Sequence, residues 1–180
     1  QRQMCIRDRY TVSGKLMDKD TGKALLVNGK EITATTTFKP TAKDGTVDLT
    51  YKLDASVLED KTVVVFEDLI HNKINVTSHA DINDEEQSVH YPKVRTTAKD
   101  HSTKDDVGTS SKEARLVDTV SYSNLIVGQK YTIKGTLMDK ETGKAIEQNG
   151  KAVTAETNFT ATAAKGSVDL TFVSVSYTHL

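Results

Sequence analysis

Hydrophobic and polar residues alternate along much of the chain with a period of two, which is typical of β-strands. The clearest runs are residues 10–16, 32–38 and 47–53. Pairs such as Asn28-Gly29 and Asp44-Gly45 lie between them, and these residue types readily adopt the positive φ that a tight turn requires. Residues 55–60 carry the only helical pattern, one turn long. The pattern predicts an all-β protein of antiparallel strands.

Composition agrees with this fold class and narrows the function. Thr accounts for 25 of the 180 residues, and β-branched side chains suit a pleated sheet better than a helix. Lys and Arg number 24 against 25 Asp and Glu, so the net charge is −1 and we expect no nucleic-acid partner. The longest apolar run, residues 63–66, is far shorter than the roughly 20 residues of a membrane-spanning helix. Cys5 is the only cysteine, which excludes an intrachain disulfide.

An internal repeat divides the chain into two tandem units. Residues 10–50 return without a gap as residues 131–171, 121 positions later. A period of this length predicts an array of domain-sized units, of which 180 residues hold two incomplete members. We expect residues 10–93 to be the C-terminal part of one β-sandwich and residues 94–173 to be the N-terminal part of the next.

The two ends of the chain depart from the repeat. Residues 1–9 and 174–180 differ from the corresponding positions of the other copy, and both resemble translated sequencing-adapter read-through. We therefore expect both flanks to be non-native, and Cys5 belongs to the first of them.

Four polar residues share the apolar side of their strands. The alternation points Glu67, Gln87, Thr96 and Asp118 inward. Burying a polar group without a partner costs on the order of 1 to 3 kcal/mol, so four such residues suggest a shared polar site. Taken singly, each residue also fits the alternative that it lies at a strand end and reaches solvent.

Five separated segments resemble one known family. They are residues 64–68 (VVFED), 79–87 (HADINDEEQ), 94–98 (VRTTA), 117–122 (VDTVSY) and 135–139 (GTLMD). In residue type and order they are similar to the VaFE-repeat surface-anchored proteins, which are Gram-positive adhesin stalks of tandem immunoglobulin-like domains. The resemblance covers residues 10–172 and implies an intramolecular Thr–Gln ester bond in each intact domain.

The resemblance gives a role to five residues. It implies that Thr96 is the nucleophile and that Gln87 is the acceptor amide. The assisting groups that it implies are His79, Glu67 and Asp118. A threonine hydroxyl is a weak nucleophile, so a neutral histidine is the natural base. Two acids that share a proton could stabilise the oxyanion and protonate the departing ammonia, and neither a metal nor another cofactor is expected.

The implied site is divided between the two units. Glu67, His79 and Gln87 fall in the first unit, whereas Thr96 and Asp118 fall in the second. The family arrangement pairs the first and last strands in parallel, which a short link through Pro92 does not permit. We therefore expect no ester within this chain, and sheet edges that are prone to pair with another chain.

The function expected from the sequence is structural. We expect tandem immunoglobulin-like repeats of an extracellular, cell-wall-anchored adhesin or fibre, whose neighbours are repeats of the same chain and whose other domains meet a host ligand. One alternative is a ligand-binding adhesin domain that recognises a host protein or glycan. A third is a hydrolase that uses Glu67, Asp118 and His79, which would require these residues to line one open cleft.

Overall fold

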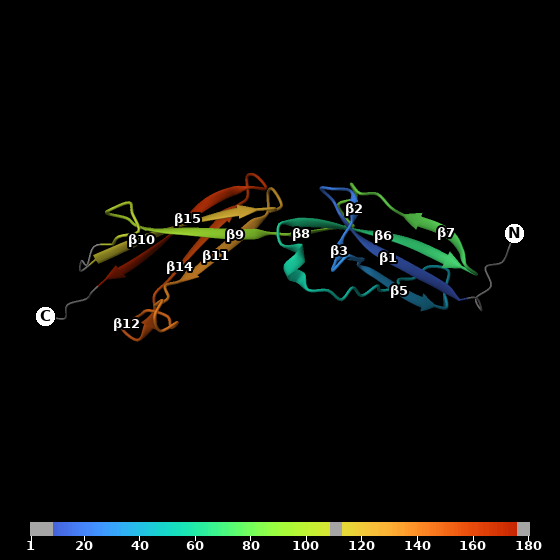
Figure 1. The fold of residues 1–180 in the computed structure, drawn as a ribbon, viewed down its shortest axis with the longest axis horizontal. Coiled ribbons are helices and arrows are strands. Elements are labelled where there is room, and N and C mark those ends of the chain that lie inside the picture. Colours follow the sequence, from blue (N-terminus) through green and yellow to red (C-terminus); the bar gives the residue numbers. More distant parts are fainter. Residues whose placement is uncertain (1–8, 109–112, 176–180) are drawn as a thin grey trace. The chain divides into compact units, whose positions relative to one another are not determined.

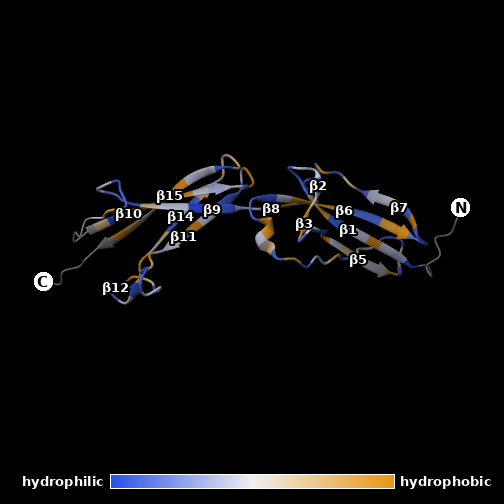
Figure 2. Cartoon of the chain, viewed as in Figure 1, coloured by the Kyte–Doolittle hydropathy of each residue, from blue (hydrophilic) through white to orange (hydrophobic). Residues whose placement is uncertain are grey.

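The computed structural model describes residues 9–108 and 113–175, which divide between Tyr91 and Pro92 into two units (Figure 1). Every strand pairing in them is antiparallel, and the only helical element among the described residues is the 3₁₀ turn η1 (Ala55–Leu58). The expectation of an all-β protein with tandem antiparallel domains is confirmed. Hydrophobic and hydrophilic residues alternate along strands of both units (Figure 2).

The first unit is one main sheet with a short hairpin beside it. Its strands are β1 (Tyr10–Asp18), β2 (Lys23–Ala24), β3 (Leu26–Val27), β4 (Lys30–Glu31), β5 (Thr33–Phe38), β6 (Lys61–His71), β7 (Ile74–His79) and β8 (Ser88–Tyr91). Strand β1 lies between β5 and β6, and β6 also pairs with β7 and β8. The turn expected at Asn28-Gly29 joins β3 to β4, with positive φ at both residues.

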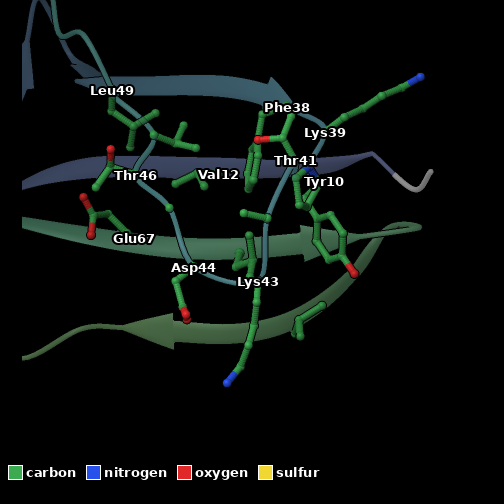
Figure 3. A pocket seen from close by; sticks show the side chains of 16 residues that line it. Tyr10, Val12, Phe38, Lys39, Thr41, Lys43, Asp44, Thr46, Leu49 and Glu67 are labelled. Atoms are coloured by element: carbon green, nitrogen blue, oxygen red, sulfur yellow. The ribbon is translucent and has the colours of Figure 1, made fainter. Parts of the chain in front are cut away.

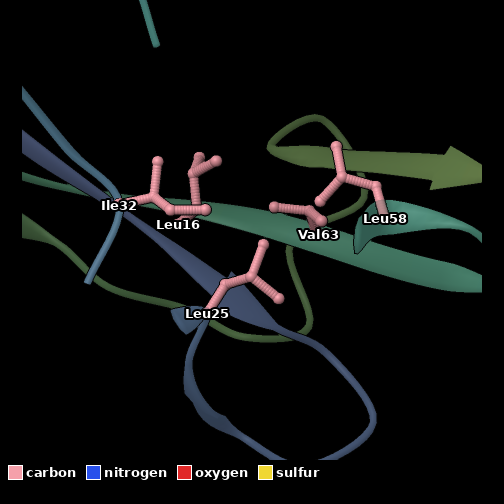
Figure 4. Packing of buried hydrophobic residues seen from close by; sticks show 5 residues of the cluster. All are labelled: Leu16, Leu25, Ile32, Leu58 and Val63. Atoms are coloured by element: carbon pink, nitrogen blue, oxygen red, sulfur yellow. The ribbon is translucent and has the colours of Figure 1, made fainter. Parts of the chain in front are cut away.

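The core of the first unit gathers at one end of this sheet. Its buried residues are Leu16, Leu25, Ile32, Leu58 and Val63, and Figure 4 shows them packed around β1 and β6. Four of the five are leucine or isoleucine, so each contributes roughly 1.5 to 3 kcal/mol by leaving water. The 3₁₀ turn expected near residue 55 supplies Leu58, which is 2 % exposed.

The second unit is a sandwich of two sheets. Its strands are β9 (Lys93–Asp100), β10 (Glu113–Ser123), β11 (Lys130–Thr136), β12 (Glu147–Gln148), β13 (Lys151–Ala152), β14 (Thr154–Thr160) and β15 (Gly166–Val175). One sheet has the order β15-β10-β9 and the other pairs β11 with β14. Val120 and Leu170 of the first sheet pack with Val153 and Ile133, so the core lies between the two layers.

Residues 45–54 correct one expectation from the sequence. Their alternation predicts a strand, and Val47, Leu49, Tyr51 and Leu53 are indeed more buried than their neighbours. They nevertheless form no strand in the first unit, and Gly45 does not adopt positive φ. The equivalent residues of the second unit are β15, whose ladder partner is β10. Among the described residues of the first unit no strand occupies the place of β10, so the alternation persists without a ladder.

The segment still lies in the same position as β15. The Thr36 hydroxyl donates to the Asp48 carbonyl at 3.1 Å, and the equivalent Thr157 hydroxyl donates to the Asp169 carbonyl at 3.2 Å. Tyr51 likewise lies over Gly14 as its equivalent Phe172 lies over Gly135, where a β-carbon would clash. The first unit therefore has one complete sheet and a second layer reduced to a coil.

Candidate functional site

Three of the expected site residues come together in the first unit. Glu67 on β6 is the direct cross-strand partner of His79, the last residue of β7. Gln87 immediately precedes β8, and its carbonyl accepts a hydrogen bond from the Val65 amide of β6 at 3.2 Å. The C-terminal part of β6 thus pairs with β7 and its N-terminal part with β8, and the middle of β6 brings the carboxylate, imidazole and amide to one region of the sheet.

The imidazole of His79 bridges two polar groups. Its Nδ1 lies 3.4 Å from Nε2 of Gln87, and its Nε2 lies 2.9 Å from Oδ2 of Asp84. An amide nitrogen can only donate, so Nδ1 accepts and the proton of a neutral imidazole is on Nε2, where it is donated to Asp84. His79 therefore presents a basic nitrogen to the amide nitrogen of Gln87.

Asp84 is a part of this arrangement that the sequence reasoning missed. It belongs to the turn of residues 81–86, where its Oδ1 accepts from the Glu86 amide at 2.9 Å and its carbonyl accepts from the Ser88 hydroxyl at 2.6 Å. These bonds fix the carboxylate that contacts His79. Acidic turns are usually solvated, so nothing in the local pattern distinguished Asp84; its spacing of five residues from His79 was the only available signal.

Glu67 faces a cavity instead of a packed core. The cavity has a volume of about 610 Å³ and is lined by Glu67, by apolar residues of the sheet and by residues 38–47 (Figure 3). Tyr51 lies close enough to Glu67 for the two side chains to interact electrostatically, and its buried hydroxyl has no hydrogen-bond partner. Burial, together with the negative charge of Glu67, raises the pKa of Tyr51 to about 12. The tyrosine consequently stays protonated and can donate a hydrogen bond into this region.

The other two expected residues lie in the second unit. Thr96 on β9 pairs with Val120 on β10, and Asp118 on β10 pairs with Ala98 on β9. Thr96 and Asp118 are therefore on the same face of adjacent strands, two positions apart in register. This is the face that packs the core, since Val120 on it is 2 % exposed.

Asp118 is held in an environment that disfavours its charge. Its Oδ1 is buried without a hydrogen-bond partner. Burial raises the pKa of Asp118, and a hydrogen bond from the Thr97 backbone only partly opposes this rise. A carboxyl that protonates more readily than usual suits a group that must share or deliver a proton.

The four residues expected to point inward do not behave alike. Glu67, Gln87 and Asp118 are half-buried, but Thr96 is exposed, contrary to expectation. The reason is that β9 is the edge strand of its sheet. The alternation places Thr96 on the inner face, but the outer edge of β9 has no neighbouring strand among the described residues, so the side chain stays open to solvent. His79, which the alternation does not point inward, is exposed as well.

Comparison with known protein families identifies the kind of domain that holds these groups. The model of the T-Q ester bond containing domain matches residues 6–91 and again residues 92–179. The chain belongs to this family. Membership makes both units structural repeats of the cell-surface kind that carries a Thr–Gln ester crosslink. No curated protein matches the chain.

Within the T-Q ester bond family the important feature of this chain is the division of its residues. Of the five residues with an expected role, Glu67, His79 and Gln87 belong to the first T-Q unit, and Thr96 and Asp118 belong to the second. Of the three residues of the hydrolase alternative, Glu67 and His79 lie in the first unit and Asp118 lies in the second.

The described parts of the T-Q units hold neither a metal-binding cluster nor a membrane-spanning helix. Across residues 9–108 and 113–175, no group of three or more His, Cys, Asp or Glu side chains could hold a metal ion. In the same residues no helix has the length and apolar character needed to cross a membrane.

Proposed function

We propose that the chain is part of an extracellular stalk, a Gram-positive adhesin or fibre of the VaFE-repeat type, in which each intact repeat closes one Thr–Gln ester. The observation that carries the proposal is the contact between His79 Nδ1 and Gln87 Nε2, supported on the other side of the ring by Asp84. It puts a proton carrier directly beside the nitrogen that must leave as ammonia.

The reaction balances without any further reactant. The threonine Oγ attacks the Cδ of the glutamine amide and gives up its proton to the imidazole, and the tetrahedral intermediate then expels the amide nitrogen. That nitrogen leaves as ammonia after it receives the proton from the imidazole. A C–O bond forms, a C–N bond breaks, and the side chains of Thr96 and Gln87 are the two partners by type.

The acids support the same step. The raised pKa of Asp118 favours a protonated carboxyl, and Glu67 lies in the cavity where an acid pair would form. Such a pair can hold one proton between two oxygens and donate a hydrogen bond to the developing oxyanion. The reaction runs once for each domain, so the protein modifies itself and does not turn over a substrate.

A stalk gains mechanical stability from this bond. An ester between the first and last strands of a domain prevents these strands from separating under tension, as a disulfide does in other secreted proteins. The described strands contain no cysteine that could take this role. Anchoring to the cell wall and contact with a host ligand through other domains belong to the same proposal.

A rearranged chain tests the proposal directly. Residues 92–173 followed by residues 53–91 restore one complete repeat in register without the expected flank, because residue 52 is the equivalent of residue 173. We expect the intact mass of this chain to fall by one ammonia, and Thr96→Ser to retain the loss. Thr96→Ala and Gln87→Ala should abolish it, and His79→Ala should slow it. A folded rearranged chain that keeps its full mass would refute the proposal.

A further inference from the structure

The cavity of the first unit has a filled counterpart in the second unit. Five of its apolar lining residues are Tyr10, Val12, Phe38, Val47 and Leu49. Their equivalents 121 positions later are Tyr131, Ile133, Phe159, Val168 and Leu170, and all five pack in the core of the second unit. These five wall positions are therefore equivalent in the two units, with Val12 in place of Ile133, whereas what lies between them differs.

In the second unit, a side chain of β10 fills the space between these equivalent residues. Tyr122 stacks on Phe159 with ring centroids 5.2 Å apart, and Phe159 lies 5.9 Å from Tyr131. The equivalent pair in the first unit, Tyr10 and Phe38, keeps nearly the same spacing at 6.1 Å. The aromatic walls are thus already in position in the first unit, with the place of the Tyr122 ring open.

A pair of glycines marks the same position. A β-carbon on Gly166 would lie 2.5 Å from the Tyr122 hydroxyl, so the tyrosine ring covers this glycine. The equivalent Gly45 has no atom within 4 Å of that point. Within the described residues, the space that Tyr122 occupies in the second unit is therefore free in the first, and no strand among them pairs with residues 45–54 beside it.

We propose that this cavity and the adjoining edge of residues 45–54 form a docking site for strand β10 of a second copy of the chain. The strand would add to residues 45–54 in the antiparallel register that β10 has with β15, with Tyr122 opposite Gly45 and Val120 opposite Val47. Apolar side chains on one face would fill the cavity, and main-chain hydrogen bonds would convert residues 45–54 into a strand.

Strand β10 has two partners in the donor but would have one in the acceptor. A donor that releases β10 loses its ladders with both β15 and β9, whereas the acceptor regains only the ladder equivalent to that with β15, so the exchange between folded copies costs free energy. Copies should therefore trade this strand only to a small extent that rises with concentration, and a free β10 peptide, which has no such contacts to lose, should bind more readily.

A peptide tests whether the site accepts this strand. We expect a synthetic peptide of residues 114–125 to bind the 180-residue chain and to shift the NMR signals of Tyr10, Phe38 and Thr46. The signals of Tyr131 and Phe159 should not move, because β10 of the chain already fills that site. A Tyr122→Ala peptide should bind about tenfold more weakly or worse.

A matched substitution separates docking from folding. Gly45→Ala places its β-carbon in open space, so the first unit should fold normally, as its unchanged NMR spectrum would show. The same β-carbon would strike the docked tyrosine ring, so peptide binding should be lost. Absence of binding to the unsubstituted chain, or equal binding to the Gly45→Ala chain, would overturn the proposal.

A crosslink identifies the source of the strand. Ser121 pairs directly with Ser167, whose equivalent in the first unit is Thr46. Mixing a Thr46→Cys chain with a Ser121→Cys chain, both in a Cys5→Ser background, should therefore give a mixed disulfide dimer that increases with concentration. Arg115→Cys, which is six residues out of register, should give little. If the peptide binds but no mixed dimer forms above this control, the second copy is not the occupant and the proposal is wrong.

Discussion

The two units place the same sequence in two environments. Leu170 lies in a two-layer core and is 1 % exposed, whereas its equivalent Leu49 lines a cavity and is half-buried. Asp18 is 6 % exposed and pairs with Lys61 at 2.7 Å, whereas its equivalent Asp139 is exposed. Both aspartates accept backbone hydrogen bonds in the turn that follows. The turn conformation is therefore set by the local sequence, whereas the burial of the aspartate depends on its tertiary neighbours.

This difference separates what local sequence decides from what partners decide. The alternation fixes which side chains face inward in both copies, even where residues 45–54 form no strand. Whether the segment becomes a strand depends on β10, which only the second unit contains in the described residues. Whether Asp18 is buried depends on β6, which only the first unit contains.

The largest expected effect tests the packing side of this comparison. Leu170→Ala should destabilise the second unit by about 3 kcal/mol, because it removes a fully buried side chain and leaves a cavity. Leu49→Ala should cost the first unit about 1 kcal/mol, because that side chain already borders open space. Hydrogen exchange in increasing urea, followed in β10 for the second unit and in β6 for the first, measures the two losses separately. Equal losses would mean that residues 45–54 pack as tightly as β15.

A second contrast concerns the charge of Asp18. Asp18→Asn keeps an oxygen for the turn hydrogen bonds but removes the charge that faces Lys61, so we expect the first unit to lose about 2 kcal/mol at pH 7. Asp139→Asn is the matched control, since it makes the same change at an exposed position, and it should change the second unit little. Urea unfolding monitored in β6 and β14 gives both values.

The pH dependence of the Asp18 effect has a definite sign. Burial alone would raise the pKa of Asp18, but hydrogen bonds from Lys61 and the Thr21 backbone outweigh it and lower the pKa below the usual 3.8. The ion pair therefore stabilises the folded first unit above that value, and its contribution is lost as the pH falls through the lowered pKa. The Asp18→Asn chain and the unsubstituted chain should converge in strong acid. A difference that persists there would assign the loss to altered packing.

Sequence reasoning predicted the fold class, the tandem organisation and the family, because period-two alternation and the 121-residue repeat can be recognised without knowing which strands pair. It placed Glu67, Gln87 and Asp118 on inner faces for the same reason. It could not foresee the exposure of Thr96, which depends on β9 being an edge strand, or the contact of Asp84 with His79, which depends on how a turn folds back on β7. The first depends on strand pairing across the sheet, and the second depends on the conformation of a turn, which alternation does not reveal.

The smallest expected effect is that of Asp118→Asn, which should stabilise the second unit, whereas Asp18→Asn should destabilise the first. Burial raises the pKa of Asp118 above the 3.8 of the unfolded chain, despite the opposing hydrogen bond from the Thr97 backbone. The folded second unit thus binds this proton more tightly than the unfolded chain, so it is favoured below pH 3.8 and loses stability as the pH rises through the raised pKa. Asp118→Asn removes the buried charge and should stabilise the second unit at pH 7 by about 1 kcal/mol.

Acidification should therefore change the stability of the two units in opposite directions: protonation of Asp18 destabilises the first unit, and protonation of Asp118 stabilises the second. The gain from Asp118→Asn should shrink as the pH is lowered toward 3.8, while the first unit loses the contribution of its Asp18–Lys61 pair. Asp169→Asn, a change at an exposed carboxylate on the neighbouring strand β15, should give no gain at any pH. Urea unfolding of β10 at several pH values measures the effect. If Asp118→Asn weakens the second unit at pH 7, the carboxylate has a stabilising partner and its role as a poised acid is excluded.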